Sequence, residues 1–144
     1  KGPKDTKNVS FNQVGNDQIL LRYADVLLMY AEALNELGYD ASEGSIALKQ
    51  LNATRTRAGL TKLTAADVPT QESFRKAILD ERQKEFPYEG HRWFDLVRMG
   101  YAKSVLATQG LNIQDYQLLF PIPQKEIEKV GNSKILWQNP GYDK

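Results

Sequence analysis

The chain has 144 residues, the length of one ordinary domain, and its 41% hydrophobic and 26% charged residues are typical of a folded globular protein. Its 19 Lys and Arg residues against 18 Asp and Glu leave a net charge of +1, which gives no electrostatic reason to expect nucleic acid as a partner. The absence of cysteine excludes disulfides and thiolate metal sites. No glycine-rich phosphate loop or metal-ligand spacing points to a cofactor.

The chain begins KGPKDTK, with neither an initiator methionine nor an apolar signal segment, as expected of a processed protein or of a piece of a larger one. Residues 1–17 are polar and predict a loop. A first helix is predicted from Gln18 to Leu37, with Gly38 as its stop. Its apolar residues recur at steps of three and four, namely Leu20, Tyr23, Leu27, Tyr30, Leu34 and Leu37. Charges within this stretch exclude a membrane span, and apolar residues on its other faces predict neighbours on several sides.

A second helix is predicted from about Ser42 to Gly59, with Ser42 or Ser45 as the N-cap. One of its faces is expected to carry Ala47, Leu48, Leu51, Thr54 and Ala58. The two helices together have the length of a tetratricopeptide-like helix pair, and their alanines would allow close packing. Because stable arrays need about three such repeats, we expect further neighbours to cover part of the pair.

A third helix is predicted from the N-cap Thr70 to about Phe86, where Pro87 stops it, and a fourth over His91–Met99. Beyond Gly100 the pattern is less regular. The stretch LLFPIP, with its two prolines, predicts an extended segment. Residues 124–130 are expected to form a short helix, and the stretch WQNPGY predicts a turn-rich tail. The prediction is therefore a mainly α fold, with a tetratricopeptide-like helix pair, further helices and an irregular C-terminal tail. We expect one domain over residues 1–144, with a helical core over about 18–100 and the tail over about 101–144.

Two carboxylates continue the apolar face of the third predicted helix. Phe74, Ile78, Glu81 and Glu85 fall within about 60° of one another at the helical period. Buried carboxylates need cationic or hydrogen-bonding partners, and the planar fork of arginine suits them. The sequence therefore predicts a structural charge network that joins Glu81 and Glu85 to arginines of neighbouring elements, the candidates being Arg55, Arg92 and Arg98.

A catalytic interpretation would make Glu81 and Glu85 a glycosidase-like acid and base. Residues one turn apart project side by side, whereas the carboxylates of a glycosidase flank the scissile bond, so geometry disfavours this interpretation. The single histidine, His91, lies beside a predicted turn and is expected to be structural. Tyr88 and Trp93 are expected to serve mostly as core residues.

Five motifs carry a family resemblance: LRYADVLLMYAEALNELG, LNATRTRAGL, ERQKEFPYEGHRWFDLVRMG, LFPIPQKEI and QNPGY. In this order they closely resemble the C-terminal part of the SusD/RagB family of nutrient-binding outer-membrane lipoproteins. The resemblance implies a mainly α-helical, tetratricopeptide-like scaffold at the cell surface of Bacteroidetes-type bacteria. It also implies an oligosaccharide ligand, a TonB-dependent (SusC-like) transporter as partner, and binding without catalysis. The lipid-bearing cysteine is absent here, so the anchor is expected on a parent protein.

Sugar contacts within the chain would come from exposed aromatic rings, which stack on the apolar faces of sugars. The candidates outside the predicted helices are Tyr39, Tyr101, Tyr116, Trp137 and Tyr142. Packing is the favoured role for each of them, and Tyr101 and Tyr116 are the best of the ligand candidates. We therefore expect this chain to act mainly as scaffold in glycan capture. The alternative is a tetratricopeptide-like interaction module that binds a peptide or a protein.

Overall fold

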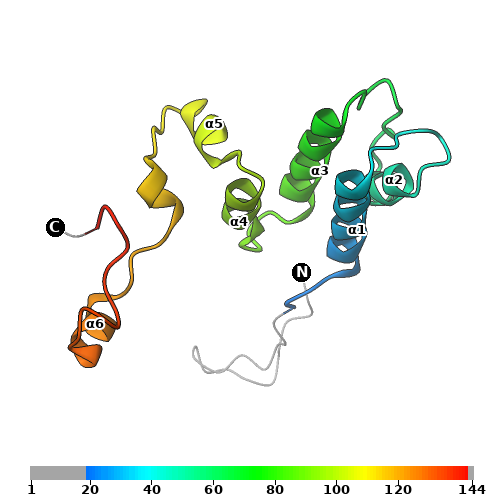
Figure 1. The fold of residues 1–144 in the computed structure, drawn as a ribbon. Coiled ribbons are helices and arrows are strands. Elements are labelled where there is room, and N and C mark those ends of the chain that lie inside the picture. The colour runs from blue at the N-terminus through cyan, green and yellow to red at the C-terminus, as the bar shows by residue number, and fades with distance from the viewer. Residues whose placement is uncertain (1–18, 143–144) are drawn as a thin grey trace, which may run out of the picture. The chain divides into compact units, whose positions relative to one another are not determined.

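The computed structural model describes residues 19–142, so the predicted loop over residues 1–17 lies outside the described residues. Within the described range the chain is helical and has no strand, which confirms the mainly α prediction (Figure 1). The elements are α1 (Tyr23–Leu37), α2 (Ile46–Arg57), α3 (Gln71–Glu85), α4 (His91–Arg98), α5 (Ala102–Ala107), the 3-10 helix η1 (Asp115–Leu118) and α6 (Gln124–Val130). No helix in this range is long and apolar enough to span a membrane.

The chain divides into two compact units, one ending at Glu85 and one beginning at Phe86. The division falls at the turn around Pro87, inside the helical core that the sequence predicts to extend to about residue 100. The single-domain organisation over residues 1–144 stays a prediction.

Helix α1 starts at Tyr23, later than predicted, because Arg22 is still extended, with φ −118° and ψ 156°. The buried residues of α1 are Asp25, Leu28, Ala31 and Asn35. The predicted apolar face is therefore wrong, since Tyr23, Tyr30 and Leu37 are exposed. The pattern of apolar residues misplaced this face because two polar side chains, Asp25 and Asn35, turn inward to partners on α3.

Helix α2 confirms Ser45 as the N-cap, because its hydroxyl oxygen accepts a hydrogen bond from the backbone N–H of Leu48. The predicted inner face is right for Ala47, Leu48, Leu51 and Thr54, all buried. It is wrong for Ala58, which lies beyond the last helical residue and is exposed. The helix ends just before Gly59, which adopts the left-handed φ of 76° that stops a helix.

Helix α3 begins with a reciprocal cap between Thr70 and Ser73. The Thr70 hydroxyl accepts from the Ser73 N–H at 3.1 Å, and the Ser73 hydroxyl accepts from the Thr70 N–H at 2.9 Å. This confirms the predicted N-cap. The core of the first unit forms where α1, α2 and α3 meet, and its fully buried side chains include Leu28, Leu51, Phe74 and Ile78.

In the second unit, α6 has the predicted bounds, and α4 ends at Arg98, one residue before the predicted end. The six-residue helix α5 was not predicted, since it is short and has no side-chain cap. The segment before α6 is pinned by Gln138, whose side chain bonds both the N–H and the C=O of Ile122, at 2.7 and 2.8 Å. The prediction of Tyr88 as a core residue is wrong, because it lies fully exposed in the turn after Pro87, with φ 65°.

Candidate functional site

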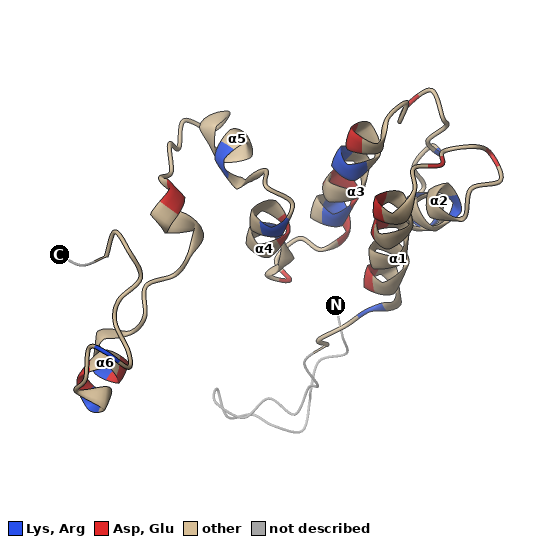
Figure 2. Ribbon diagram, in the orientation of Figure 1, with Lys and Arg blue, Asp and Glu red and all other residues tan. Residues whose placement is uncertain are grey.

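The predicted carboxylates of α3 lie on its buried face, together with Phe74 and Ile78. Glu81 is 1% exposed. Its Oε2 accepts a hydrogen bond from Nη1 of Arg55 at 2.9 Å, and Nε of the same arginine donates to the carbonyl of Thr61 at 3.0 Å. One guanidinium thus joins the last turn of α2 to the following loop and to α3. Figure 2 shows the acidic and basic residues that alternate along α3.

Glu85 is held by two arginines that sequence reasoning did not single out. Nη1 of Arg22 donates to Glu85 Oε1 at 2.8 Å, and Nη2 donates to the Glu85 carbonyl, also at 2.8 Å. Arg57, at the end of α2, is ion-paired with the other carboxylate oxygen. Glu85 therefore links the residue before α1 with the last residue of α2. No single cue in the sequence marks Arg22 as a partner, because 63 residues separate it from Glu85.

The most deeply buried of the ion pairs in the described part of the unit was also missed. Nη1 of Arg82 lies 2.6 Å from Oδ1 of Asp25, and the two side chains are only 4% and 8% exposed. A signal for it exists in the sequence, because Asp25 interrupts the apolar run of α1 and Arg82 directly follows the predicted Glu81. Three ion-paired carboxylates with buried side chains, Asp25 of α1 and Glu81 and Glu85 of α3, thus lie among the described residues of the first unit.

The other predicted arginines lie in the second unit. Arg92 belongs to α4 and is half-buried. Arg98 pairs with Asp95 of its own helix, with Nη2 and Oδ1 2.9 Å apart. The arginines that reach Glu81 and Glu85 in the described contacts are Arg55, Arg22 and Arg57. The stabilising role of the charge network remains a prediction that mutagenesis can test.

Glu81 and Glu85 lie side by side along one face of α3, and each is paired with a guanidinium. They do not face one another across a cleft. A general acid and base would have to reach the two sides of a bound substrate. Among the described residues, no group of three or more His, Cys, Asp or Glu side chains could hold a metal ion. The arrangement is suited to fixing the helices against one another.

A solvent-exposed ion pair fastens α1 to α3 at the far end of the same contact. Nε and Nη2 of Arg75 donate to the two carboxylate oxygens of Glu36, each at 2.5 Å. These hydrogen bonds lower the pKa of Glu36 below its ordinary value of 4.5. Because the folded state lowers this pKa, the pair contributes stability above about pH 4.5, and the contribution is lost as the pH falls through the lowered pKa.

We expect Glu36→Gln to reduce stability near neutral pH and to have a smaller effect at acidic pH, because the contribution of the wild-type carboxylate decreases as the pH falls below about 4.5 towards its lowered pKa. Urea midpoints of both proteins at about pH 7 and about pH 3 measure this difference. A deficit of the same size at both pH values would show that the charge of Glu36 contributes nothing.

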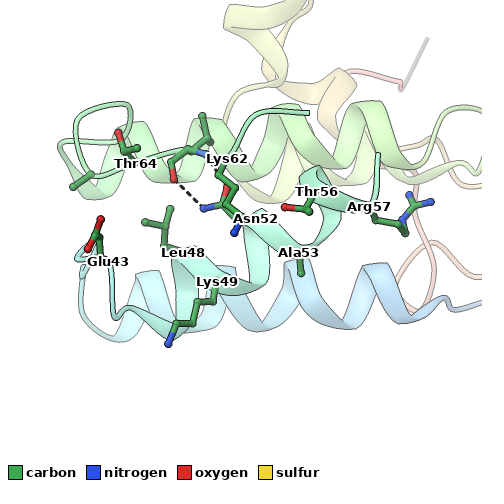
Figure 3. A pocket seen from close by; sticks show the side chains of 11 residues that line it. Glu43, Leu48, Lys49, Asn52, Ala53, Thr56, Arg57, Lys62 and Thr64 are labelled. Carbon is green, nitrogen blue, oxygen red and sulfur yellow. Dashed lines mark hydrogen bonds between the residues drawn. The ribbon is translucent and has the colours of Figure 1, made fainter. Parts of the chain in front are cut away.

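A cleft of about 670 Å³ opens beside α2 and is bordered by the loop that follows it (Figure 3). Asn52 holds this loop, because its side chain donates to the Leu63 carbonyl at 2.9 Å and accepts from the Leu63 N–H at 2.8 Å. The cleft is lined by aliphatic, threonine and basic side chains together with Asn52 and the acidic Glu43, and no aromatic ring is among its lining residues. In Figure 3 the ends of Lys49 and Arg57 lie well apart, so these cations do not converge on one point. The cleft therefore lacks a stacking surface for a sugar ring.

Three of the aromatic candidates, Tyr39, Tyr116 and Tyr142, contact other segments of the chain. Tyr39 donates its hydroxyl to the Val68 carbonyl at 2.5 Å. The ring of Tyr116 meets that of Tyr142 edge-on at 5.1 Å, and the Tyr142 hydroxyl donates to the Leu119 carbonyl at 3.0 Å. Tyr101 is half-buried at the start of α5. Trp137, by contrast, is exposed. A sugar contact by Tyr101 or Tyr116 stays a prediction.

Known proteins similar to this chain share one family. The model of the SusD family matches residues 1–116. SusD-like protein P2 of Formosa agariphila is 37% identical over an alignment of 136 residues, and the alignment covers 86% of this chain and 26% of that protein. The starch-binding protein SusD of Bacteroides thetaiotaomicron is 31% identical over an alignment of 131 residues, which covers 85% of this chain and 21% of that protein.

No solved structure matches the chain. The chain spans about a quarter of the length of the curated relatives that it matches. The family match extends over most of its residues, including the three helices that carry the buried ion pairs. This chain is a member of the SusD family.

Proposed function

We propose that this chain is a helical scaffold within a cell-surface protein that binds oligosaccharides and delivers them to a TonB-dependent, SusC-like transporter at the outer membrane. Family membership and the similarity to a protein named for starch binding support the glycan ligand. The observation that carries the scaffold role is the set of buried ion pairs that tie α1, α2 and α3 together. Arginine-paired carboxylates that fix helices support binding without catalysis.

A chimera tests the proposal. The chain replaces the segment that it matches in the starch-binding protein SusD of Bacteroides thetaiotaomicron. If the chain is scaffold, the chimera should bind starch oligosaccharides with an affinity close to that of the intact Bacteroides protein, as measured by calorimetric titration. A folded chimera that has lost this binding would contradict the scaffold role, because it would place glycan contacts inside the exchanged segment.

The chain alone supplies the complementary measurement. When it is titrated with starch, plant and host-type oligosaccharides, we expect no saturable heat, since the described cleft has no aromatic lining and Tyr116 is engaged with Tyr142. Saturable heat from one glycan class that disappears in Tyr101→Ala or Tyr116→Ala, with the melting temperature unchanged, would instead place a sugar site on this chain.

The second candidate function is a module that binds a peptide or protein segment. One specific observation favours it, namely the apolar side of α1 that remains exposed. In a binding module, a separate molecule would cover this side of α1. In a scaffold, another part of the same protein would cover it.

A further inference from the structure

The cleft beside α2 has two walls that come from different elements. One wall is the exposed side of α2 from Lys49 to Arg57, and the other is the following loop with Lys62 and Leu63. Figure 3 shows the side chains of both walls. Because Lys49 and Arg57 are eight residues apart on one helix, the cleft extends for about 12 Å along the helix axis. It is therefore long enough for several residues of another chain.

The loop wall of the cleft is held in place by side chains of the same unit. The two hydrogen bonds between the side chain of Asn52 and the backbone of Leu63 fix the middle of the loop. The carboxylate of Asp67 accepts hydrogen bonds from the N–H and the hydroxyl of Thr64, each at 2.8 Å. A wall that is already ordered reduces the entropy that a partner loses the chain on binding. The cleft is thus preformed.

The lining of the cleft carries more positive than negative charge. Lys49 and Lys62 have no ion-pair partner among the described residues. Arg57 is paired with Glu85, but its side chain is 64% exposed, so the guanidinium remains open to solvent. Glu43 is the one acidic side chain of the lining, and in Figure 3 it lies at the other end of the cleft from Arg57. Such a lining is complementary to an anionic partner.

The spacing of the cations indicates what kind of anion fits. Lys49 and Arg57 are about 12 Å apart along α2, so a phosphate ion or a single carboxylate cannot bridge them. An extended peptide rises about 3.3 Å per residue, and its residues at even spacing point to the same side. Two acidic side chains four positions apart therefore reach both cations. The side chains of Ala53 and Thr56 between them are small and leave room for a peptide backbone.

The chemistry of the lining also favours a protein segment over a glycan. No aromatic ring lines the cleft, so a sugar ring has no stacking surface there. Charged residues are depleted from the cores of permanent interfaces, so a lining with three cations is suited to a reversible contact with a separate molecule. We propose that the cleft docks an extended acidic segment of a separate protein, whose acidic side chains face Lys49 and Arg57 and whose backbone lies beside Lys62. This contact is distinct from the glycan binding of the proposed function.

A fluorescent peptide tests the proposal. The probe has eight residues, with two glutamates four positions apart among serines and threonines, and the control peptide has lysine at the same two positions. Binding to the 144-residue chain is followed by fluorescence anisotropy at an ionic strength of about 0.01 M, where charges are screened least. We expect the glutamate peptide to bind saturably and the lysine peptide not to bind. Failure of the glutamate peptide to bind a chain that melts cooperatively would overturn the proposal.

Matched variants locate the binding site. Lys49→Ser with Lys62→Ser removes two cations from the cleft, and Lys125→Ser with Lys134→Ser removes the same charge from exposed positions in the second unit. We expect the first pair to weaken binding on the order of tenfold and the second pair by less than about twofold. Ala53→Phe places a ring in the cleft without a change of charge and should also weaken binding on the order of tenfold. All five positions are exposed, so the melting temperature should stay unchanged.

Three results would overturn the proposal. Equal weakening by the two lysine pairs would show that only net charge matters, and full binding by Ala53→Phe would place the peptide outside the cleft. Binding of tetragalacturonate that is lost in Lys49→Ser with Lys62→Ser, without binding of the peptide, would make an acidic glycan the occupant. That last result would also contradict the scaffold role. Failure of both probes to bind, with starch binding intact in the chimera, would contradict the docking proposal alone.

Discussion

Replacement of Glu81 by alanine should lower the free energy of unfolding by about 3–5 kcal/mol, the cost of breaking a buried ion pair from one side. The substitution leaves the guanidinium of Arg55, 14% exposed, without the carboxylate 2.9 Å away. It also removes a side chain packed in the core, next to Ile78 on the same helix face. Urea denaturation followed by circular dichroism at pH 7 measures the loss.

The matched control is Glu43→Ala. Glu43 is an exposed glutamate of the same unit, and its replacement should change stability by no more than about 0.5 kcal/mol. The double variant Arg55→Met with Glu81→Leu should recover most of the loss, since it leaves no charge buried without a partner. A Glu81→Ala protein with the wild-type urea midpoint would show that this contact contributes nothing to stability.

Replacement of Asp25 by alanine should have an effect of similar size, about 3–5 kcal/mol, because Arg82 has less access to water than any other arginine of the described ion pairs. With both side chains under 10% exposed, solvent cannot replace the lost partner. The exposed Asp80→Ala on α3 serves as the control and should be nearly neutral.

The pair Asp25→Leu with Arg82→Met separates charge from packing at this site. Apolar residues of similar volume often match or exceed the stability of a buried ion pair, so we expect the double variant to be far more stable than Asp25→Ala. A double variant as unstable as Asp25→Ala would show that the contribution of Asp25 lies elsewhere, for example in the first turn of α1.

The sequence predicted the features that depend on a few neighbouring residues. Thr70 was identified as an N-cap, and Ser45 as one of two candidates beside Ser42, because a hydroxyl followed by a helical pattern has a local physical reason to bond the first free N–H groups. The burial of Glu81 followed from its place in the helical period after Phe74 and Ile78.

Features that depend on distant partners were predicted poorly. The inner face of α1 was misplaced because hydrophobicity alone cannot show that Asp25 turns inward, when its partner Arg82 is 57 residues away. Tyr88 was expected in the core, but it lies in the turn after Pro87 with φ 65°, and its side chain is fully exposed. Glu85 pairs with Arg22 and Arg57 because of the way α1, α2 and α3 pack together. A pattern of neighbouring residues in the sequence does not contain this information.

The sequence separation of the ion pairs bears on the order of folding. Helices α1 and α2 are neighbours in the chain and can pair early, whereas the pairs with α3 close separations of 26 residues (Arg55–Glu81), 57 (Asp25–Arg82) and 63 (Arg22–Glu85). Contacts that form after the transition state affect the unfolding rate and leave the folding rate almost unchanged. The arginines that join α3 to the helix pair should therefore govern the lifetime of the folded unit more than the speed of its formation.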